Sequence, residues 1–520
     1  MNSVATSRSR NSLRNAKYGA VFYVLILIST FFFRRYFIQA LGVDLLGVNA
    51  TVQNLLGFLN VAELGLASAV AFALYKPLYE SDQEQIKDIV SIQGWFYRYI
   101  AIFVSLGSIV LLFYFPQIFQ KTKLPIWYAY STYGVMLYGT LLSYLFNYRQ
   151  VIFTSDQRDY RVTLAVQAPK LIKMVLQTLC LYLNVPNAYI WWLVLEFVAS
   201  SLTTILIEIF LRRDYPWLST SVRRGLCKRK DYPVIMKKTG QLIFHKISAF
   251  ALFQLSPLLL YYFTNADMVA IYTNYVVIMN GVVAVVDTPF RGITGSVGNL
   301  VASGNHKRSE EVFVRLYFFR LWVVLLVIGV LYTVANMFVS LWVGPDLVLG
   351  KWPFLLWLLY TLISSMRLQD VFISAYGLYH DIWAPVAEMI INLVLSFWLG
   401  TYWGLSGILT GACISVFSIA TIWRLIFLYR RGFGFSFFPF IFKVLSFFSI
   451  NIVALGMGTY LVNRIFMGMM SHATLGNFLM VSGATVFILS LLTFGINMIL
   501  SKTFRTVIIS LQKKLIGRVH

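Results

Sequence analysis

The stretch that decides the fold is Leu55–Lys87, which reads LLGFLNVAELGLASAVAFALYKPLYESDQEQIK. It has the composition of one long apolar helix, and an acid, Glu63, lies near its start between Gly57 and Gly65. A helix of this length can cross a bilayer, where an uncompensated charge costs roughly 3 kcal/mol or more. We therefore expect Glu63 to face a cavity or a partner, with a hydrogen bond between packed helices as the alternative.

Apolar runs of this kind recur along the chain and predict an all-α polytopic membrane protein. Hydrophobic residues make up 59% of the sequence and charged residues 12%, whereas soluble domains carry roughly twice that charged fraction. The runs are too continuous for the alternating strands of a membrane β-barrel. Hydropathy predicts about fourteen spans. Their approximate limits are 18–40, 52–78, 95–115, 127–152, 163–184, 188–211, 240–263, 269–299, 316–343, 352–378, 383–400, 404–428, 438–462 and 475–500.

The distribution of basic residues predicts that both chain ends face the cytoplasm. The formal net charge is +23, but its lysines and arginines flank the spans, so we expect no nucleic-acid partner. The predicted outer loops hold only Lys121, Lys123, Lys351 and Arg464, which is the positive-inside bias. Residues 1–17 are expected to be a cytoplasmic leader, because no small-residue cleavage site follows the first apolar run.

The two halves of the chain resemble each other in hydropathy and loop placement. Val43–Gly47 aligns with Ala266–Ala270, and each segment leads from an outer loop through a long helix into a polar inner loop. Such a match predicts two bundles of the same orientation. The predicted organisation is a basic N-terminus (1–17), a six-helix bundle (18–211), a basic linker (212–239), a second six-helix bundle (240–428), two added helices (429–500) and a basic tail (501–520).

Two adjacent arginines, Arg34 and Arg35, lie well inside the first predicted span. Adjacent residues of a helix point about 100° apart, so both side chains cannot easily face the same partner. Arginines within a span usually face a cavity or the interior of a bundle. We expect at least one of the two to line a cavity.

Other charges in or near the spans have a plain explanation beside a functional one. Lysines near the inner ends of spans can extend their ammonium groups to the interface. An acid and a base three or four residues apart can neutralise each other on one helix. The lysines are Lys76, Lys170, Lys173 and Lys246, and the pairs are Asp287 with Arg291 and Arg367 with Asp370.

The sequence lacks the common signatures of enzymes and metal sites. It has no P-loop, no HExxH, no GxSxG and no paired histidines, and its three cysteines show no ligand spacing. We therefore expect a transporter that is not an enzyme and uses no cofactor or metal. The excess of bases over acids within the spans indicates an anionic substrate, since guanidinium groups bind phosphate well.

A set of short motifs lies between Arg34 and Ile89. They are Arg35-Tyr36-Phe37-Ile38, Leu41-Gly42, Leu46-Gly47, Ala62-Glu63-Leu64-Gly65 and Leu74-Tyr75-Lys76-Pro77-Leu78, the last followed by an acidic patch. With these motifs the segment resembles the polysaccharide transporter family of lipid-linked oligosaccharide flippases, within the multidrug/oligosaccharidyl-lipid/polysaccharide superfamily. Beyond about residue 100, topology and span count agree with this family, while the sequence itself adds little.

The resemblance implies a fold and a substrate. Spans 1–6 and 7–12 would form two bundles around a central cleft that opens alternately to each side. The substrate would be undecaprenyl-pyrophosphate bearing a short oligosaccharide, flipped to the outer leaflet of a bacterial inner membrane for O-antigen, capsule or exopolysaccharide synthesis. A polysaccharide polymerase and other assembly proteins would be further partners.

The resemblance also suggests roles for individual residues. Arg34 or Arg35 would bind the pyrophosphate, and charge and span position make Lys246 and Arg291 candidates opposite them. An inside-negative potential favours outward movement of an anion by about 2.3 kcal/mol per charge per 100 mV. We therefore expect the potential or a proton or sodium gradient to drive transport. The candidates for ion coupling or gating are Glu63 and Asp287, and Lys76, Lys170, Lys173, Arg367 and Asp370 are secondary candidates.

Three other functions stay open. A multidrug extruder for organic cations would need a cavity dominated by acids, whereas this sequence has more bases within its spans. A membrane glycosyltransferase or polysaccharide polymerase would need a large extramembrane loop or a cluster of acids and arginines, and neither is visible in the sequence. A non-transporting partner that organises polysaccharide assembly is the third.

Overall fold

The computed structural model describes residues 2–63, 66–233, 235, 258–291, 297, 300–301, 304–376, 378, 381, 383–470, 474–501, 504–506 and 508. Every regular element in these residues is a helix, which confirms the predicted all-α fold. Ten of the described helices are long and apolar enough to cross a membrane, so this is a multi-pass membrane protein. The chain divides into two compact units, the N-lobe (Met1–Ala270) and the C-lobe (Ile271–His520).

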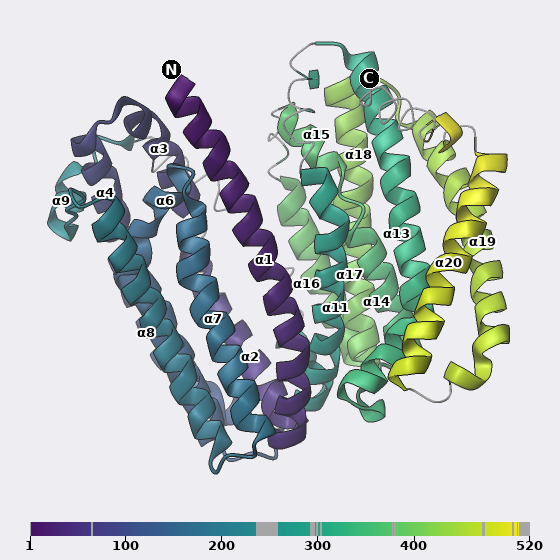
Figure 1. Ribbon diagram of the computed structural model, residues 1–520, viewed down its shortest axis with the longest axis horizontal. Coiled ribbons are helices and arrows are strands. Elements are labelled where there is room, and N and C mark those ends of the chain that lie inside the picture. Colours follow the sequence, from purple (N-terminus) through teal and green to yellow (C-terminus); the bar gives the residue numbers. More distant parts are fainter. Residues whose placement is uncertain are drawn as a thin grey trace. The chain divides into compact units, whose positions relative to one another are not determined.

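The N-lobe is a bundle of long helices connected by short ones. Its described elements are α1 (Asn2–Leu41), α2 (Val43–Leu59), η1 (Asn60–Glu63), α3 (Leu66–Glu80), α4 (Gln83–Ile118), α5 (Trp127–Leu145), η2 (Asn147–Gln150), α6 (Val151–Ser155), α7 (Asp159–Tyr182), α8 (Ala188–Asp214) and α9 (Val222–Lys228). Helix α7 packs between α1 and α8, as Figure 1 shows. Helix α4 contacts α3, α5 and α9.

The core of the N-lobe lies where α3, α4 and α6 meet. Val70 and Leu74 of α3, Val90 and Val104 of α4 and Ile152 of α6 are fully buried there. Lipid tails are as apolar as these side chains, so close packing rather than removal from water holds such helices together. This packing fixes the ends of the short helices that carry polar residues.

The prediction of one continuous helix through 52–78 is wrong. Helix α2 ends at Leu59, Asn60–Glu63 form a single 3₁₀ turn, and α3 begins at Leu66. Asparagine is a poor helix former, and Asn60 is the first residue of the interruption. Average hydropathy over a long window hides such a local break.

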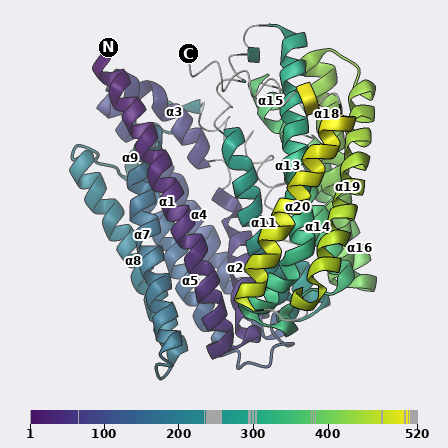
Figure 2. The ribbon, with the colours of Figure 1, turned by 45° about the vertical axis from the view of Figure 1, so that its right-hand side comes forward.

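The C-lobe combines a helical bundle with two final helices on one side. Its elements are α11 (Ala266–Arg291, which begins in the N-lobe), α13 (His306–Val343), η3 (Pro345–Leu347), α14 (Lys351–Ser364), α15 (Gln369–Ala375), α16 (Trp383–Trp403), α17 (Leu405–Ser415), η4 (Val416–Trp423), α18 (Arg424–Phe427), η5 (Leu428–Phe433), α19 (Phe438–Met470) and α20 (Leu475–Leu500). Figure 2 shows α13 beside α20.

Two glycines of α17 allow its backbone to touch α16. A Cβ added to Gly407 would lie 2.0 Å from the Leu399 carbonyl oxygen, and one added to Gly411 would lie 2.5 Å from the Ser396 amide nitrogen. No side chain fits at either distance. This helix continues to Phe433 and contains two π-helical segments, η4 and η5, in which the turn is wider than in an α-helix.

The final two helices are tied to each other by a pair of buried amides. Asn451 of α19 donates to the Asn497 side-chain oxygen at 3.2 Å, and Asn497 of α20 donates back to Asn451 at 2.8 Å. Both side chains are fully buried. Both helices pack on α13, so they belong to the same compact unit as the preceding bundle.

Three further expectations concern spans and the linker. The predicted spans 127–152 and 352–378 each consist of shorter helices, α5 with η2 and α6, and α14 with α15. The predicted span 240–263 lies mostly outside the described residues, so the count of fourteen stays a prediction. The described part of the predicted linker 212–239 belongs to the N-lobe, where Arg224 of α9 binds Asp88 at 2.5 Å and Glu84 at 2.8 Å on α4.

Candidate functional site

The break between α2 and α3 contains Glu63, the acid within the second predicted span. Glu63 is half-buried at the end of the 3₁₀ turn, and the Tyr97 hydroxyl of α4 donates to its Oε1 at 2.5 Å. The Tyr144 hydroxyl of α5 donates to the Asn60 side-chain oxygen at 2.9 Å. The rings of Tyr97 and Tyr144 pack edge to face, with their centroids 5.5 Å apart. The break is therefore a polar centre inside the N-lobe, lined by neutral phenols.

This centre has the chemistry of a proton or cation site. The Tyr97 phenol donates to Glu63, and no described residue forms an ion pair with this acid. Broken helices in transporters expose backbone and carboxylate oxygens that bind ions. Sequence alone pointed to Glu63 but missed Tyr97 and Tyr144, because nothing in their spacing shows that α4 and α5 approach the break.

The two arginines of α1 have different surroundings. Arg34 is half-buried, and its guanidinium donates to the Ala270 carbonyl oxygen at 3.3 Å. Arg35 is exposed and forms no ion pair within the described residues. Phe37, one turn further on, is completely buried against Trp192. The helix therefore directs Arg34 into the N-lobe and Arg35 out of it.

Of the candidate lysines that the structure describes in the N-lobe, Lys173 is interior and Lys76 and Lys170 are exposed. Lys173 of α7 binds Glu196 of α8 at 2.7 Å, and Gln177 donates to the same carboxylate at 3.3 Å. Lys170, one turn before Lys173, is exposed. Lys76 is also exposed and pairs with Glu80 at 3.8 Å on its own helix. Lys173 thus ties two helices together, whereas Lys76 has the surroundings of a surface residue.

The structure gives Asp287 a partner on another helix, one that the sequence did not suggest. Asp287 of α11 binds Arg320 of α13 at 2.5 Å, and the Arg320 Nε donates to the Ser365 carbonyl oxygen at 2.7 Å. Arg320 is only 3% exposed, so its charge is held inside the C-lobe. Arg291 is the last residue of α11, and its side chain is outside what the structure describes. Lys246 lies outside the described residues altogether.

The plain explanation of Arg367 and Asp370 as a pair on one helix is wrong. Asp370 of α15 binds Arg424 of α18 at 2.7 Å, while Arg367 lies 3.6 Å from Glu388 of α16. Sequence reasoning missed Arg320 and Arg424, although each is a lone arginine within a predicted apolar span, which is itself a signal. The local spacing was misleading because residues on neighbouring helices compete with those one turn away.

An apolar groove lies on the C-lobe between α13, α14, the α17–η4 helix and α19. Its volume is about 440 Å³, and Leu321, Ile363, Met366, Phe417 and Phe448 contribute to its walls. Almost all of the lining surface is hydrocarbon. A saturated or isoprenoid chain fits such a groove, since only packing contacts are available.

The structure resembles solved transporters of the MOP superfamily. The lipid II flippase MurJ, in an inward closed conformation, aligns with TM-score 0.65 and 10% identity over 94% of this chain and 100% of its own. An inward-facing multidrug resistance transporter of the MATE family aligns with TM-score 0.55 and 10% identity over 77% and 94%. An outward-facing MATE family transporter aligns with TM-score 0.52 and 13% identity over 81% and 96%.

At these identities the likeness establishes the fold alone, which this chain shares with these solved transporters. No protein-family model matches the sequence, and no curated protein matches it either.

Proposed function

We propose that this protein is a flippase that moves undecaprenyl-pyrophosphate-linked oligosaccharides from the cytoplasmic to the outer leaflet of a bacterial inner membrane by alternating access. The observation that carries the proposal is the pair Arg34 and Arg35 within the apolar helix α1, in a chain that shares its fold with a lipid flippase. Surface polysaccharide synthesis would use the product, with a polymerase among the downstream partners.

The physical task favours cationic residues inside the protein. Sugar hydroxyls and a pyrophosphate cannot cross hydrocarbon without partners, since each unsatisfied polar group costs several kcal/mol. Arginine donates paired hydrogen bonds that match phosphate oxygens, so Arg34 or Arg35 would hold the pyrophosphate. Lys246 and Arg291 remain the proposed residues opposite them.

The lipid tail needs no aqueous path. The polyprenyl chain can stay in the bilayer or lie in the apolar groove beside Phe417 and Phe448 while the head group crosses. Membrane potential or an ion gradient drives the outward step, with Glu63 as the coupling site. Asp287 is a weaker candidate for this role because Arg320 already neutralises it.

The test measures which leaflet holds the oligosaccharide lipid. In spheroplasts of cells depleted of the protein, membrane-impermeant periodate oxidises sugars in the outer leaflet only. We expect the protected fraction to rise, surface polymer to fall, and wild-type protein to reverse both. Arg35→Ala and Arg34→Ala should fail to restore them, while Lys76→Ala, an exposed lysine at the end of α3, serves as the matched control.

A multidrug extruder is the second candidate, because the MATE family shares the fold and Glu63 supplies an acid that organic cations could bind. It predicts unchanged oligosaccharide lipids in depleted cells together with new sensitivity to cationic drugs. That result would replace the flippase proposal. Flipping that ignores both potential and ion gradients would remove only the coupling hypothesis.

A further inference from the structure

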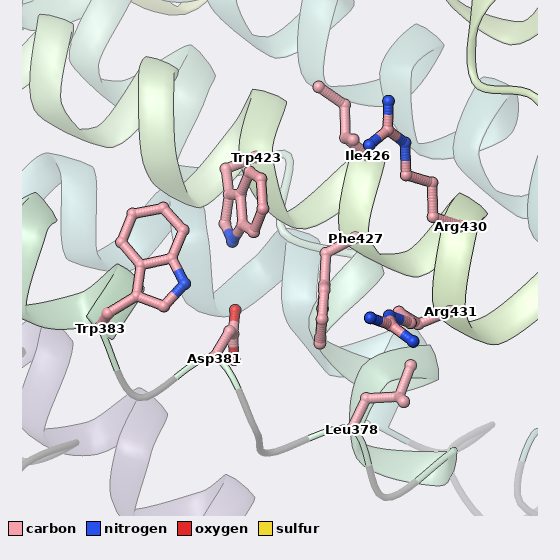
Figure 3. Close-up of a pocket in the computed structure, with 8 residues that line it drawn as sticks. All are labelled: Leu378, Asp381, Trp383, Trp423, Ile426, Phe427, Arg430 and Arg431. Carbon is pink, nitrogen blue, oxygen red and sulfur yellow. The ribbon is translucent and has the colours of Figure 1, made fainter.

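A second cavity lies in the C-lobe, and none of its lining residues is among those proposed for translocation. Its volume is about 660 Å³, within the range of small-molecule sites. Figure 3 shows its walls: Trp423, Phe427, Arg430 and Arg431 come from the end of the long helix that starts at Leu405, and Asp381 and Trp383 come from the start of α16 and the residues before it.

The helix that forms one wall has an unusual backbone. Trp423 ends the π-helical segment η4, and Arg430 and Arg431 lie in the second segment, η5. π-helical turns are rare and occur frequently at functional sites, where they place side chains that a regular helix would direct elsewhere. Two of them in one helix, both contributing to one cavity, argue against a simple packing defect.

The cavity is rich in hydrogen-bond donors for which the described residues supply no acceptor. Arg430 and Arg431 are exposed and form no ion pair with any described residue. The Trp423 indole nitrogen is buried and has no hydrogen-bond partner among the described residues. A buried donor normally has an acceptor, so an acceptor from outside the protein is the natural partner.

The remaining wall residues suit a ligand that also carries hydroxyl groups. The rings of Trp383 and Trp423 lie 4.8 Å apart, edge to face, and offer apolar faces to a carbon skeleton. Asp381 is buried, and its carboxylate can accept hydrogen bonds from hydroxyl groups. In Figure 3 the two tryptophans and Asp381 lie together, and Arg431 lies across Phe427 from them.

The positive-inside rule explains part of this site but not all of it. Basic residues are expected at the cytoplasmic end of a span, and Arg430 and Arg431 occupy such a position in the predicted topology. The rule gives no reason for a cavity, a buried acid and an indole without an acceptor beside them. Asp370 of α15 already pairs with Arg424, which is on the same helix as Arg430 and Arg431. Asp370 therefore does not neutralise these two exposed arginines.

We propose that this cavity binds a polyol phosphate: Arg430 and Arg431 hold the phosphate, the Trp423 indole donates to one of its oxygens, and Asp381 accepts from the hydroxyl groups. The chemistry fits two sources, the glycerophosphate head group of an anionic phospholipid and a soluble sugar phosphate. The lining of this cavity includes neither Arg34 nor Arg35.

The test uses the full-length protein in nanodiscs and two probes. For the lipid source, native mass spectrometry compares retention of phosphatidylglycerol with that of phosphatidylcholine. For the soluble source, equilibrium binding of radiolabelled glucose 1-phosphate is measured with the protein in phosphatidylcholine nanodiscs, with inorganic phosphate as competitor. We expect one of the two probes to bind saturably.

The Arg430→Ala/Arg431→Ala variant should weaken binding of that probe at least tenfold, and Arg430→Lys/Arg431→Lys should recover part of it. The matched control is Arg212→Ala/Arg213→Ala, which removes the same charge from the end of α8 and should leave binding unchanged. Trp423→Phe, which keeps a ring but removes the indole donor, should weaken binding about threefold, whereas Trp403→Phe at an exposed position should not.

Each outcome decides the proposal. Saturable binding of phosphatidylglycerol alone identifies the lipid head group, and binding of glucose 1-phosphate alone identifies the soluble ligand. Equal losses in the Arg430/Arg431 and Arg212/Arg213 variants would show that only net charge matters and would overturn the site. Failure of both probes to bind wild-type protein that is monodisperse in nanodiscs would overturn it as well.

Discussion

Charged side chains within the apolar helices have different partners in the two lobes. In the C-lobe, three acids each meet an arginine from another element, in the pairs Asp287–Arg320, Asp370–Arg424 and Glu388–Arg367. In the N-lobe, the Glu63 carboxylate meets a neutral phenol and Arg34 meets a backbone carbonyl. Arg35 is exposed.

Charges in ion pairs between helices and charges that contact only neutral groups have different roles. An ion pair between two helices neutralises both charges and fixes the helices, so it leaves little charge for a ligand. A hydrogen bond from a phenol to a carboxylate is not an ion pair, so such an acid can still attract a cation. We infer that the charges paired between helices are structural, namely the three C-lobe pairs and Lys173–Glu196 of the N-lobe. Glu63 and Arg35 of the N-lobe, which form no ion pair within the described residues, are then available for transport.

Removing one partner of the most buried ion pair should have the largest effect on stability. Arg320→Met leaves Asp287 without its cation, and breaking a buried ion pair costs about 3–5 kcal/mol. We expect a large loss of folded protein, measured as the fraction that stays monodisperse after heating in detergent. The double variant Arg320→Met/Asp287→Leu should recover most of that loss. A single variant as stable as wild type would contradict the structural role.

The arginines of α1 should show the opposite behaviour. Arg35→Ala removes charge-assisted hydrogen bonds to substrate, worth about 1.5–3 kcal/mol, so flipping should slow roughly tenfold to a hundredfold while heat stability stays unchanged. Arg35→Lys should retain part of the rate. The readout is the periodate-protected fraction of oligosaccharide lipid. Full activity in Arg35→Ala together with inactive Arg34→Ala would move the phosphate contact to Arg34.

Substitution of the acid at the helix break should affect transport but hardly affect stability. Glu63→Gln keeps an acceptor for Tyr97 but loses the charge, so we expect a stability change below about 1 kcal/mol. Flipping in proteoliposomes should lose its dependence on an imposed proton or sodium gradient. Tyr97→Phe should preserve that dependence. Gradient-dependent flipping by Glu63→Gln would place the coupling ion elsewhere.

The smallest effect is expected at the exposed lysine of α3. Lys76→Ala removes a surface ion pair with Glu80, and such pairs on one helix contribute about 0.3–0.5 kcal/mol. Neither heat stability nor flipping should change beyond that amount. A strong flipping defect in this variant would show that the α3 end contacts substrate and that the N-lobe has more working charges than proposed.

The sequence predicted the class of fold, because long apolar runs leave few alternatives. It did not predict the break at Asn60–Glu63, since one asparagine and one glycine hardly change an average over the span. Nor did it predict the partners of Asp287 and Asp370, which depend on which helices become neighbours in space. The cavity beside Trp423 depends on π-helical turns, for which the sequence has no recognised signal.

The close contact at Gly407 has a mechanical consequence. Backbones that touch with no side chain between them cannot slide past each other by a fraction of a turn, because the next side chains would collide. Helices α16 and α17 must therefore move as one rigid body in any conformational change of the C-lobe. Bending is easiest where the same long helix changes its winding, in the segments Val416–Trp423 and Leu428–Phe433. The wall that carries Arg430 and Arg431 lies at this natural hinge, so a ligand bound there would stiffen it.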